Sequence, residues 1–243
     1  MIAKPAQRIS PAVPSKDTVV RARLDRRGMR SERLSRRSRS KRRVRPYLWE
    51  AEKLDNAVYV ALAGTSTPRL DRLMRHLSSA ANYSGLNLAC ATVLATAGGA
   101  TGRRAAASGL ASVAVTSAFV NVVLKQIGRR RRPSPKPGLL PMARRIAMPR
   151  SPSFPSGHTA SAVAFAAGAG RVSTPASLPL HTLAALVGYS RVHTGVHYPS
   201  DVVAGALTGA AVADLTAGMI DHITTRTSAD GARQPPAPRA SVR

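Results

Sequence analysis

A long run of apolar residues, from about residue 85 to residue 221, constrains this chain most, because both flanks are polar, charged or proline-rich. Five segments within it have the composition of membrane-crossing helices: 86–100, 105–124, 158–170, 176–190 and 202–220. Only 105–124 reaches the roughly 20 residues that an isolated span needs. Ala, Gly, Ser and Thr are abundant, including Gly205-x-x-x-Gly209, which suits close helix packing in lipid. We predict an all-α, membrane-embedded helical bundle of about five spans; a soluble Ala-rich bundle is the alternative.

The segments around these spans have patterns of their own. Apolar residues at helical spacing, with charges between them, predict two amphipathic helices at 48–64 and 67–81. The segment 133–155 contains seven prolines and is therefore predicted as a loop. The predicted folded domain covers 47–221, and a polar, proline-containing tail follows at 222–243.

Much of the positive charge lies at the N-terminus. The formal net charge is +26, and residues 1–46 contribute sixteen Lys or Arg against three acids, a net +13. This segment lacks apolar periodicity, which predicts a disordered basic tail, and no apolar run follows it closely enough for a signal peptide. We expect anionic lipid headgroups as its partner and no specific nucleic acid. A basic scaffold that binds nucleic acid or an anionic membrane without catalysis is the alternative, although aromatic residues, at 4%, are scarce for base stacking.

The first motif, Lys125-Gln-Ile-Gly-Arg-Arg-Arg-Arg132-Pro133, places cations at the end of an apolar segment. Two helical turns separate Lys125 from Arg132, so a helix that ends at Pro133 would bring both to one face. A point charge and a planar guanidinium can grip a phosphate together. For this motif alone, a basic cluster that flanks a membrane span is the alternative.

The second motif, Pro155-Ser156-Gly157-His158, precedes the helical run TASAVAFAAG. Ser156 is predicted to cap this helix, whose free N–H groups at the first turn offer a site for an anion. Gly157 lacks a side chain where a phosphate oxygen would approach, and His158 would stand beside the phosphate. A capped helix with an incidental histidine is the alternative.

The third motif extends from Ser190 to Asp201 and contains Arg191 and His197. Arg191 adds a guanidinium at a helix end, and Pro199 favours the start of a new helix. Asp201 would then lie in the first turn of that helix and accept a hydrogen bond from one ring nitrogen of His197. Such a bond fixes the tautomer and leaves the other nitrogen free to attack an electrophile.

Acidic residues are scarce around these motifs. None occurs from 72 to 200, and only Asp201, Asp214 and Asp221 fall between 72 and 221. A metal-dependent phosphatase needs several carboxylates or histidines that converge on its ions. We therefore predict no metal site and no cofactor, and a specific role for Asp201.

Together the motifs resemble the signature of the type 2 phosphatidic acid phosphatase (PAP2) superfamily: Lys-x6-Arg-Pro, Pro-Ser-Gly-His and Ser-Arg-x5-His-x3-Asp. The resemblance covers roughly 47–221, includes every defining position, and is closest to membrane-bound actinobacterial members. It implies that His197 is the nucleophile, that Asp201 orients it, and that His158 protonates the leaving oxygen. It also implies that the following residues bind the phosphate: Lys125, Arg132, Ser156, Gly157 and Arg191.

The resemblance implies a metal-independent phosphatase that forms a phosphohistidine from a phosphate monoester or diphosphate. The implied substrate is a lipid or polyprenyl phosphate, and the implied location is the cell membrane, with several spans and an active site on the outer face. Membrane members usually have six spans, one more than the segments of this chain predict. A related branch binds vanadate and oxidises halides; its members are typically larger and soluble, which disfavours that alternative.

Overall fold

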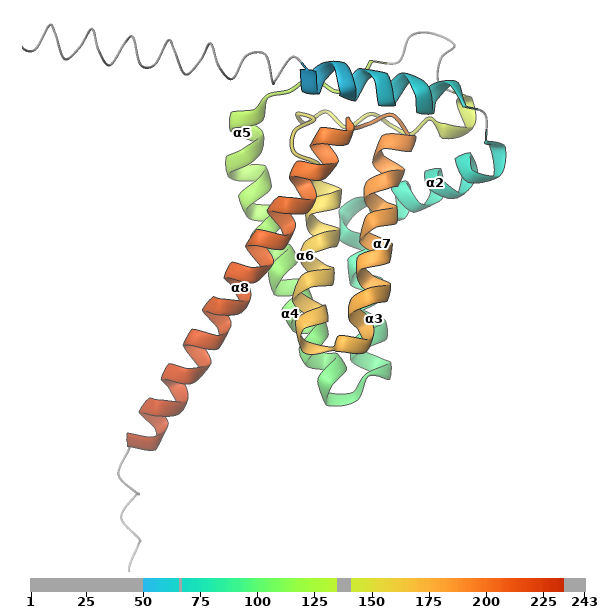
Figure 1. Cartoon of the computed structure of the whole chain (residues 1–243). Coiled ribbons are helices and arrows are strands. Elements are labelled where there is room, and N and C mark those ends of the chain that lie inside the picture. Colours follow the sequence, from blue (N-terminus) through green and yellow to red (C-terminus); the bar gives the residue numbers. More distant parts are fainter. Residues whose placement is uncertain (1–49, 66, 135–140, 234–243) are drawn as a thin grey trace, which may run out of the picture. The chain divides into compact units, whose positions relative to one another are not determined.

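The computed structural model describes residues 50–65, 67–134 and 141–233; the other residues are drawn as a grey trace in Figure 1. The fold and the site belong to the unit Lys53–Arg243. The basic tail predicted at 1–46 lies outside the described residues, so its disorder stays a prediction.

Helices form the regular structure of the described residues, which contain no β-strand, so the all-α prediction is confirmed. After the helix at 50–64 come α2 Pro68–Ala80, α3 Gly85–Ala97, α4 Gly99–Phe119, α5 Lys125–Gly128, α6 Gly157–Val172, α7 Thr174–His193 and α8 Pro199–Arg233. Three short turns join them: the 3₁₀ turns Asn82–Ser84 (η1) and Met142–Arg144 (η3), and the π-helical turn Val120–Leu124 (η2). Each predicted helical segment overlaps one of these helices, and the largest difference is at the C-terminal end of α8.

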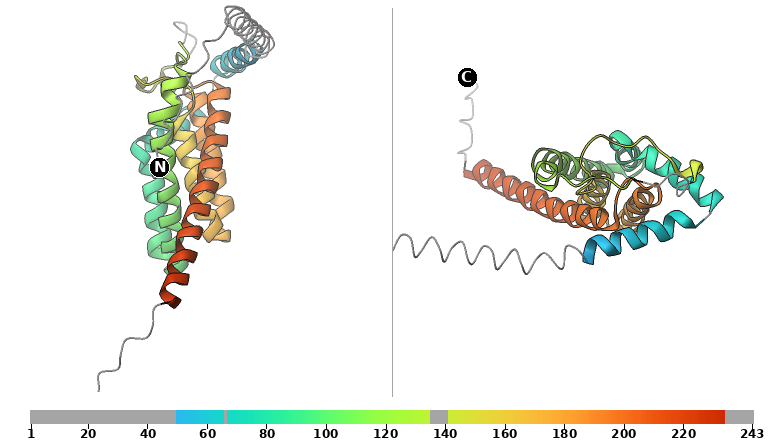
Figure 2. Two further views of the ribbon diagram at one scale, coloured as in Figure 1. Left: turned by 90° about the vertical axis from the view of Figure 1, so that its left-hand side faces the viewer. Right: turned by 90° about the horizontal axis from the view of Figure 1, so that it is seen from above.

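The core is built around α6, which packs against α4, α7 and α8 (Figure 2). The side chains that α6 buries are mostly small: Ala160, Ala164 and Ala169 are 0% exposed. Small side chains let helices approach closely, so that van der Waals contacts accumulate along their whole length. The composition rich in alanine thus produces a narrow, tightly packed bundle.

Gly205 and Gly209, whose spacing predicted close helix packing, form the face of α8 that touches α6. A Cβ on Gly205 would lie 2.5 Å from the carbonyl oxygen of Ser156, and a Cβ on Gly209 would overlap the carbonyl oxygen of Ala160. Any larger residue would push the two helices apart, because the packed interior has no space to absorb it. These two glycines therefore set the position of the start of α6 relative to α8.

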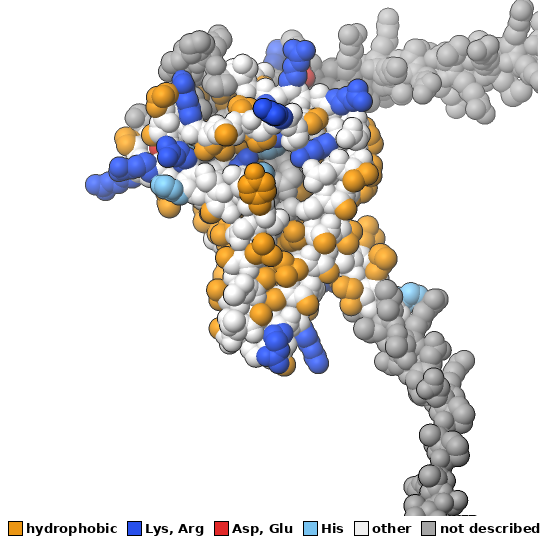
Figure 3. Space-filling model, turned by 180° about the vertical axis from the view of Figure 1, so that it is seen from behind, with side chains coloured by type: hydrophobic (Ala, Val, Ile, Leu, Met, Phe, Trp, Pro, Cys, Tyr) orange, Lys and Arg blue, Asp and Glu red, His pale blue; other side chains and the backbone are white. Residues whose placement is uncertain are grey.

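Large apolar side chains point away from the bundle. Val122, Leu178 and Leu207 are 71%, 76% and 68% exposed, and Figure 3 shows apolar side chains covering the stem of the molecule between basic side chains at its ends. The helical segments Gly99–Gly128 and Pro199–Ile220 are long and apolar enough to cross a membrane. An apolar exterior around a helical core is typical of a membrane-embedded bundle. The predicted number of spans, five, stays a prediction.

One predicted helix end is wrong. The helix that begins the first motif ends at Gly128 and not at Arg132, because Arg129 adopts a φ of 28°. Gly128 lies against Phe154, whose carbonyl oxygen would be 2.8 Å from a Cβ at this glycine. At the other end of the chain, α8 continues past 221 to Arg233, since no proline interrupts the sequence until after that residue.

A buried ion pair fastens the loop after α5 to the bundle. Arg144 donates from Nε to Oδ1 of Asp71 in α2 at 2.7 Å, and His193 at the end of α7 donates from Nε2 to the same oxygen at 3.0 Å. Burial opposes the charge on this carboxylate, but hydrogen bonds from Thr67, Arg144 and His193 hold the pKa of Asp71 below its ordinary value. The charged Asp71 therefore ties α2, the loop and α7 together.

Candidate active site

The three motifs meet at one end of the bundle, where α5 and α7 end and α6 and α8 begin (Figure 1). The residues predicted for the site lie together there: Lys125, Arg132, Ser156, Gly157, His158, Arg191, His197 and Asp201. Lys125 and Arg132 do not share a helix face as predicted. The loop after α5 folds back instead, so that both cations donate to the hydroxyl of Ser151, at 3.3 Å and 3.2 Å.

His197 is buried, with 1% of its surface exposed, and its two ring nitrogens have different partners. Arg132 donates from Nη1 to Nε2 at 3.0 Å, and a guanidinium cannot accept, so Nε2 carries the lone pair of the ring. Nδ1 then bears the proton and lies 3.5 Å from Asp201 Oδ2 and 3.5 Å from Ser153 Oγ. Burial lowers the pKa of His197 to about 4, although the Asp201 carboxylate opposes this effect. The ring is therefore neutral near neutral pH, with its lone pair on Nε2 directed at Arg132.

Asp201 is fully buried and held by several donors. The hydroxyl of Ser153 and the backbone N–H of Tyr198 both donate to Oδ2, the latter at 2.9 Å, and Arg130 donates from Nη1 to Oδ1 at 3.0 Å. These bonds leave the carboxylate little freedom to rotate. Ser153, which the sequence analysis missed, lies within reach of both Asp201 and His197 and so links the two side chains.

A network behind Asp201 was also missed. Arg130 donates from Nη2 to Oδ2 of Asp55 at 2.8 Å, and its guanidinium lies 4.2 Å above the ring of Tyr198. Asp55, in the helix at 50–64, accepts the N–H of Ser200 at 2.9 Å. Nothing distinguishes Arg130 from its arginine neighbours in the sequence, because only the fold brings Asp55 to the start of α8.

Arg191 is fully buried at the end of α7 and uses only one edge of its guanidinium. Nη1 donates to the backbone oxygen of Ser78 at 3.0 Å and to its hydroxyl at 2.7 Å. Nε and Nη2 are buried and have no hydrogen-bond partner among the described residues. Buried donors are normally paired, and two adjacent N–H groups match two oxygens of an oxyanion. This unpaired edge fits a phosphate group.

The start of α6 differs from the prediction in one respect. Ser156 occupies the N-cap position, but its side chain does not cap the helix, because its hydroxyl pairs with that of Thr159 at 2.9 Å. The first turn of α6 therefore has no side-chain cap, and an anion could bind its N–H groups. A Cβ on Gly157 would lie 3.7 Å from Nζ of Lys125, so a side chain here would occupy the space in front of that cation.

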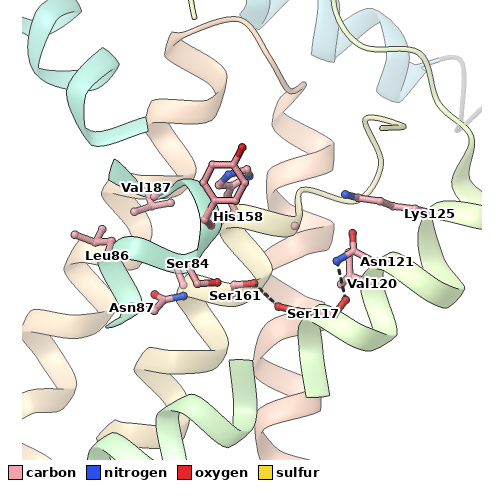
Figure 4. A pocket seen from close by; sticks show the side chains of 14 residues that line it. Ser84, Leu86, Asn87, Ser117, Val120, Asn121, Lys125, His158, Ser161 and Val187 are labelled. Carbon is pink, nitrogen blue, oxygen red and sulfur yellow. Dashed lines mark hydrogen bonds between the residues drawn. The ribbon is translucent and has the colours of Figure 1, made fainter. Parts of the chain in front are cut away.

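His158 lines a cavity at this end of the bundle (Figure 4). Its Nε2 donates to Oδ1 of Asn82 in η1 at 3.0 Å. Together with Lys125 and Gly157 it lines the cavity. The sequence has no signal for Asn82, because a contact between residues so far apart leaves no local pattern.

Metal ligands do not gather at this end of the bundle. Within the described part of the chain, no group of three His, Cys, Asp or Glu could hold a metal ion. His193, which also lies in the third motif, donates to Asp71 and so helps to hold the fold together.

Comparisons with known proteins relate this chain to one family of phosphatases. The sequence profile of the PAP2 superfamily matches residues 106–223. Residues 106–223 are therefore similar in sequence to the PAP2 superfamily. The matched region contains every residue predicted for the site, from Lys125 to Asp201.

Relatives and solved structures extend the comparison. Decaprenylphosphoryl-5-phosphoribose phosphatase of Mycobacterium tuberculosis, strains CDC 1551 / Oshkosh and H37Rv, is 40% identical over 104 residues. The match covers 41% of this chain and 55% of that protein, so the chain spans about half the length of this curated relative.

Two crystal structures share the fold with a TM-score of 0.55 each. One is a transmembrane PAP2-type phosphatidylglycerolphosphate phosphatase from Bacillus subtilis, 24% identical, with 71% of this chain and 87% of that chain covered. The other is LpxE from Aquifex aeolicus, 23% identical, with 68% and 95% covered. At these identities the two structures establish the PAP2 fold alone.

Proposed function

We propose that the PAP2 domain is a metal-independent phosphatase that hydrolyses a phosphate monoester or diphosphate through a phosphohistidine on His197. The pairing of His197 carries this proposal: Arg132 contacts Nε2, while Asp201 and Ser153 face Nδ1. A neutral imidazole held in this tautomer presents its lone pair toward the cations that would hold a phosphate.

The phosphate would be held by three cations and a helix start. The unpaired Nε and Nη2 of Arg191 take two oxygens, while Lys125, Arg132 and the N–H groups of the first turn of α6 take the others. These donors stand in place before the reaction begins. They offset the negative charge on the phosphoryl oxygens in the transition state at little cost of reorganisation.

In the first step, Nε2 of His197 attacks phosphorus, the phosphorus–nitrogen bond forms, and the bond to the leaving oxygen breaks. His158, as an imidazolium, gives its proton to that oxygen, so the leaving group departs as an alcohol or, from a diphosphate, as a phosphate. The negative charge of a bound phosphate offsets Lys125, Arg132 and Arg191, and thereby favours the protonated form of His158.

In the second step, water hydrolyses the phosphohistidine. Neutral His158 takes one proton from the water molecule, whose oxygen bonds to phosphorus as the phosphorus–nitrogen bond breaks. Inorganic phosphate leaves, and the lone pair returns to Nε2 of His197. The net reaction consumes one water, and at its end both histidines are back in their starting states, with His158 again an imidazolium.

The substrate class that the relatives support is a lipid or polyprenyl phosphate in a membrane. The name of the mycobacterial relative contains a polyprenyl phosphate, and the apolar exterior of the bundle would place the site next to lipid. The chain would cross the cell membrane several times, with the site on its outer face. The basic segment 1–46 would bind anionic lipid headgroups.

Phosphate release by the purified full-length protein, with EDTA present, tests the proposal. The substrates are phosphatidic acid, a polyprenyl diphosphate and a polyprenyl-phosphoryl sugar phosphate. His197→Ala should lose about a thousandfold or more of the activity, since it removes the nucleophile. His181→Ala, at an exposed position in α7, is the matched control. Wild-type rates in folded His197→Ala protein would contradict the proposal.

A further inference from the structure

A cavity of about 180 Å³ lies beside His158, between α3, the end of α4 and α6 (Figure 4). Lys125, Gly157 and His158 belong both to its lining and to the phosphate site. The cavity therefore opens on the side of the phosphate where His158 would protonate the leaving oxygen. The group that departs with this oxygen must lie in or pass through this space.

Polar groups gather along the wall of the cavity. Figure 4 shows Ser84, Asn87 and Ser161 close together, on η1, α3 and α6 respectively. The hydroxyl of Ser161 lies 3.2 Å from that of Ser117 in α4, and one of these two hydroxyls keeps its proton free for a further acceptor. Hydroxyls and an amide recognise other hydroxyl groups well, because each can both donate and accept.

Asn87 gives the strongest sign of a ligand. It is 8% exposed, lines the cavity, and its side-chain amide makes no hydrogen bond with any residue that the structure describes. Because this amide faces the cavity, its two donors and its acceptor are open to a ligand there. A ligand group that donates to and accepts from this amide would satisfy it.

The remaining lining and the size of the cavity limit the ligand. Leu86, Val120 and Val187 supply apolar surface, which suits the C–H faces of a sugar ring as well as an alkyl chain. A cavity of about 150 Å³ is enough to hold one benzene molecule. The volume here therefore holds one ring of that size, and a long acyl or prenyl chain would have to extend beyond it.

The turn that closes the cavity is held in an unusual conformation. Tyr83 and Ser84 in η1 have φ angles of 53° and 59°, in the left-handed region that residues with a side chain rarely adopt. This conformation places Asn82 on the His158 ring and Ser84 on the cavity wall. Strained backbone of this kind is concentrated at functional sites, where the surroundings hold it in place.

We propose that this cavity is a leaving-group subsite for one small polyhydroxylated unit, such as a pentose, whose phosphate monoester the enzyme cleaves. The proposal rests on the proposed phosphatase activity. Hydroxyls of the unit bind the amide of Asn87 and the hydroxyls of Ser84 and Ser161, while its C–H face lies on the apolar lining. Any lipid portion of the substrate continues outside the cavity.

A bare alkyl leaving group is the competing ligand, and the lining disfavours it. An alkyl chain would cover Asn87 without pairing its amide, which costs the full desolvation of that group. Sites built to bind a hydroxyl reject analogues that lack it for this reason. A subsite for a hydroxylated unit should therefore favour the substrate with hydroxyls, whereas a subsite for an alkyl chain should favour the substrate without them.

Ribose 5-phosphate and n-pentyl phosphate make this comparison, because both carry a phosphate on the primary oxygen of a five-carbon unit. With the full-length protein in detergent and EDTA present, kcat/KM should be at least about tenfold higher for ribose 5-phosphate. Asn87→Leu, a change of similar volume, should reduce that preference about tenfold. Ser161→Ala provides a second variant with less effect on packing and should reduce the preference in the same direction.

Thr92→Val is the matched control, since Thr92 lies on α3 but is exposed, and the preference should persist in that variant. Equal kcat/KM for both probes in the wild type, or an unchanged preference in folded Asn87→Leu and Ser161→Ala proteins, would overturn the subsite while phosphatase activity stands. No phosphate release from either probe or from the lipid phosphates would overturn the phosphatase proposal and the subsite together.

Discussion

Arg191 is bound through one edge of its guanidinium and presents the other. Ser78 holds Nη1, while Nε and Nη2 are buried and have no partner among the described residues. His197 is arranged in the same way, since Nδ1 faces its structural partners and Nε2 faces the cations. At the scale of single residues, each of these two side chains is held in place through one of its nitrogen atoms and turns another toward the candidate phosphate site.

Replacing Arg191 with lysine tests the importance of the guanidinium edge. A lysine keeps the charge but cannot hold Ser78 and two phosphate oxygens at the same time. Arg191→Lys should weaken competitive inhibition by inorganic phosphate more than tenfold, because at least one charge-assisted hydrogen bond is lost. Arg171→Lys, at an exposed ion pair with Asp214, is the matched control. Equal inhibition constants in both variants would contradict a bidentate role.

The contact between Asp201 and His197 should affect how kcat/KM depends on pH. Burial lowers the pKa of His197 to about 4, and the Asp201 carboxylate acts in the opposite direction. Asp201→Asn removes this opposing influence, so the pKa of His197 should fall further and the ring should stay neutral at lower pH. The acid limb of kcat/KM against pH should therefore move to lower pH.

The plateau of the same profile should fall about a hundredfold or more, because the imidazole is held less firmly in its reactive tautomer. The ionisation of the substrate is the same for both proteins, so a difference between their profiles reports the enzyme. An acid limb that moves to higher pH in Asp201→Asn would show that another group controls it.

At the scale of helices, the site depends on the contact between α6 and α8. Ser156 and His158 begin α6, Asp201 lies in the first turn of α8, and the N–H of Ser156 donates to the backbone oxygen of Asp201 at 2.9 Å. The two glycines of α8 allow this approach. A change in the distance between the two helices would move His158, the proposed proton donor, away from His197, the proposed nucleophile.

Gly209→Ala should therefore destabilise the fold and reduce activity. The added methyl group would overlap the Ala160 carbonyl oxygen, and overpacking of this kind costs about 1–3 kcal/mol. Gly218→Ala is the control on the same helix, because no atom lies within 4 Å of a Cβ there. Unfolding in mixed micelles measures the difference, and equal stability of the two variants would contradict the close contact.

At the scale of the whole bundle, the site and the turn between α3 and α4 lie at opposite ends (Figure 1). The apolar surface between them would occupy the membrane, with the site on the outer face as proposed. Charge alone does not decide the orientation, since basic side chains occur at both ends (Figure 3).

Cysteine labelling in intact cells tests this orientation. In a Cys90→Ser background, Met142→Cys at the site end should react with an impermeant maleimide, because residue 142 is 74% exposed. Arg103→Cys, near the start of α4, should react only after the membrane is permeabilised. The reverse pattern would place the site on the inner face, and labelling of both in intact cells would contradict a membrane-embedded bundle.

The sequence by itself determined the helices, the small-residue face of α8, and the residues that gather at the site. In each of these features the residues are only a few positions apart in the sequence, so the geometry of the helix alone decides which face they share or where the helix ends. Two local predictions were wrong because another residue intervened. The helix of the first motif ends at Gly128, which lies against Phe154, and the hydroxyl of Ser156 pairs with Thr159 instead of capping α6.

Only the tertiary structure decided which residues support the site. Asp55 and Arg130 brace Asp201, Asn82 holds His158, and Asn87 faces the cavity. Each of these contacts joins segments that are far apart in the chain, and such pairs leave no periodicity or spacing in one sequence. Hydrogen bonds act over a few ångströms in space whatever the separation along the chain, so these partners became visible only when the helices were packed.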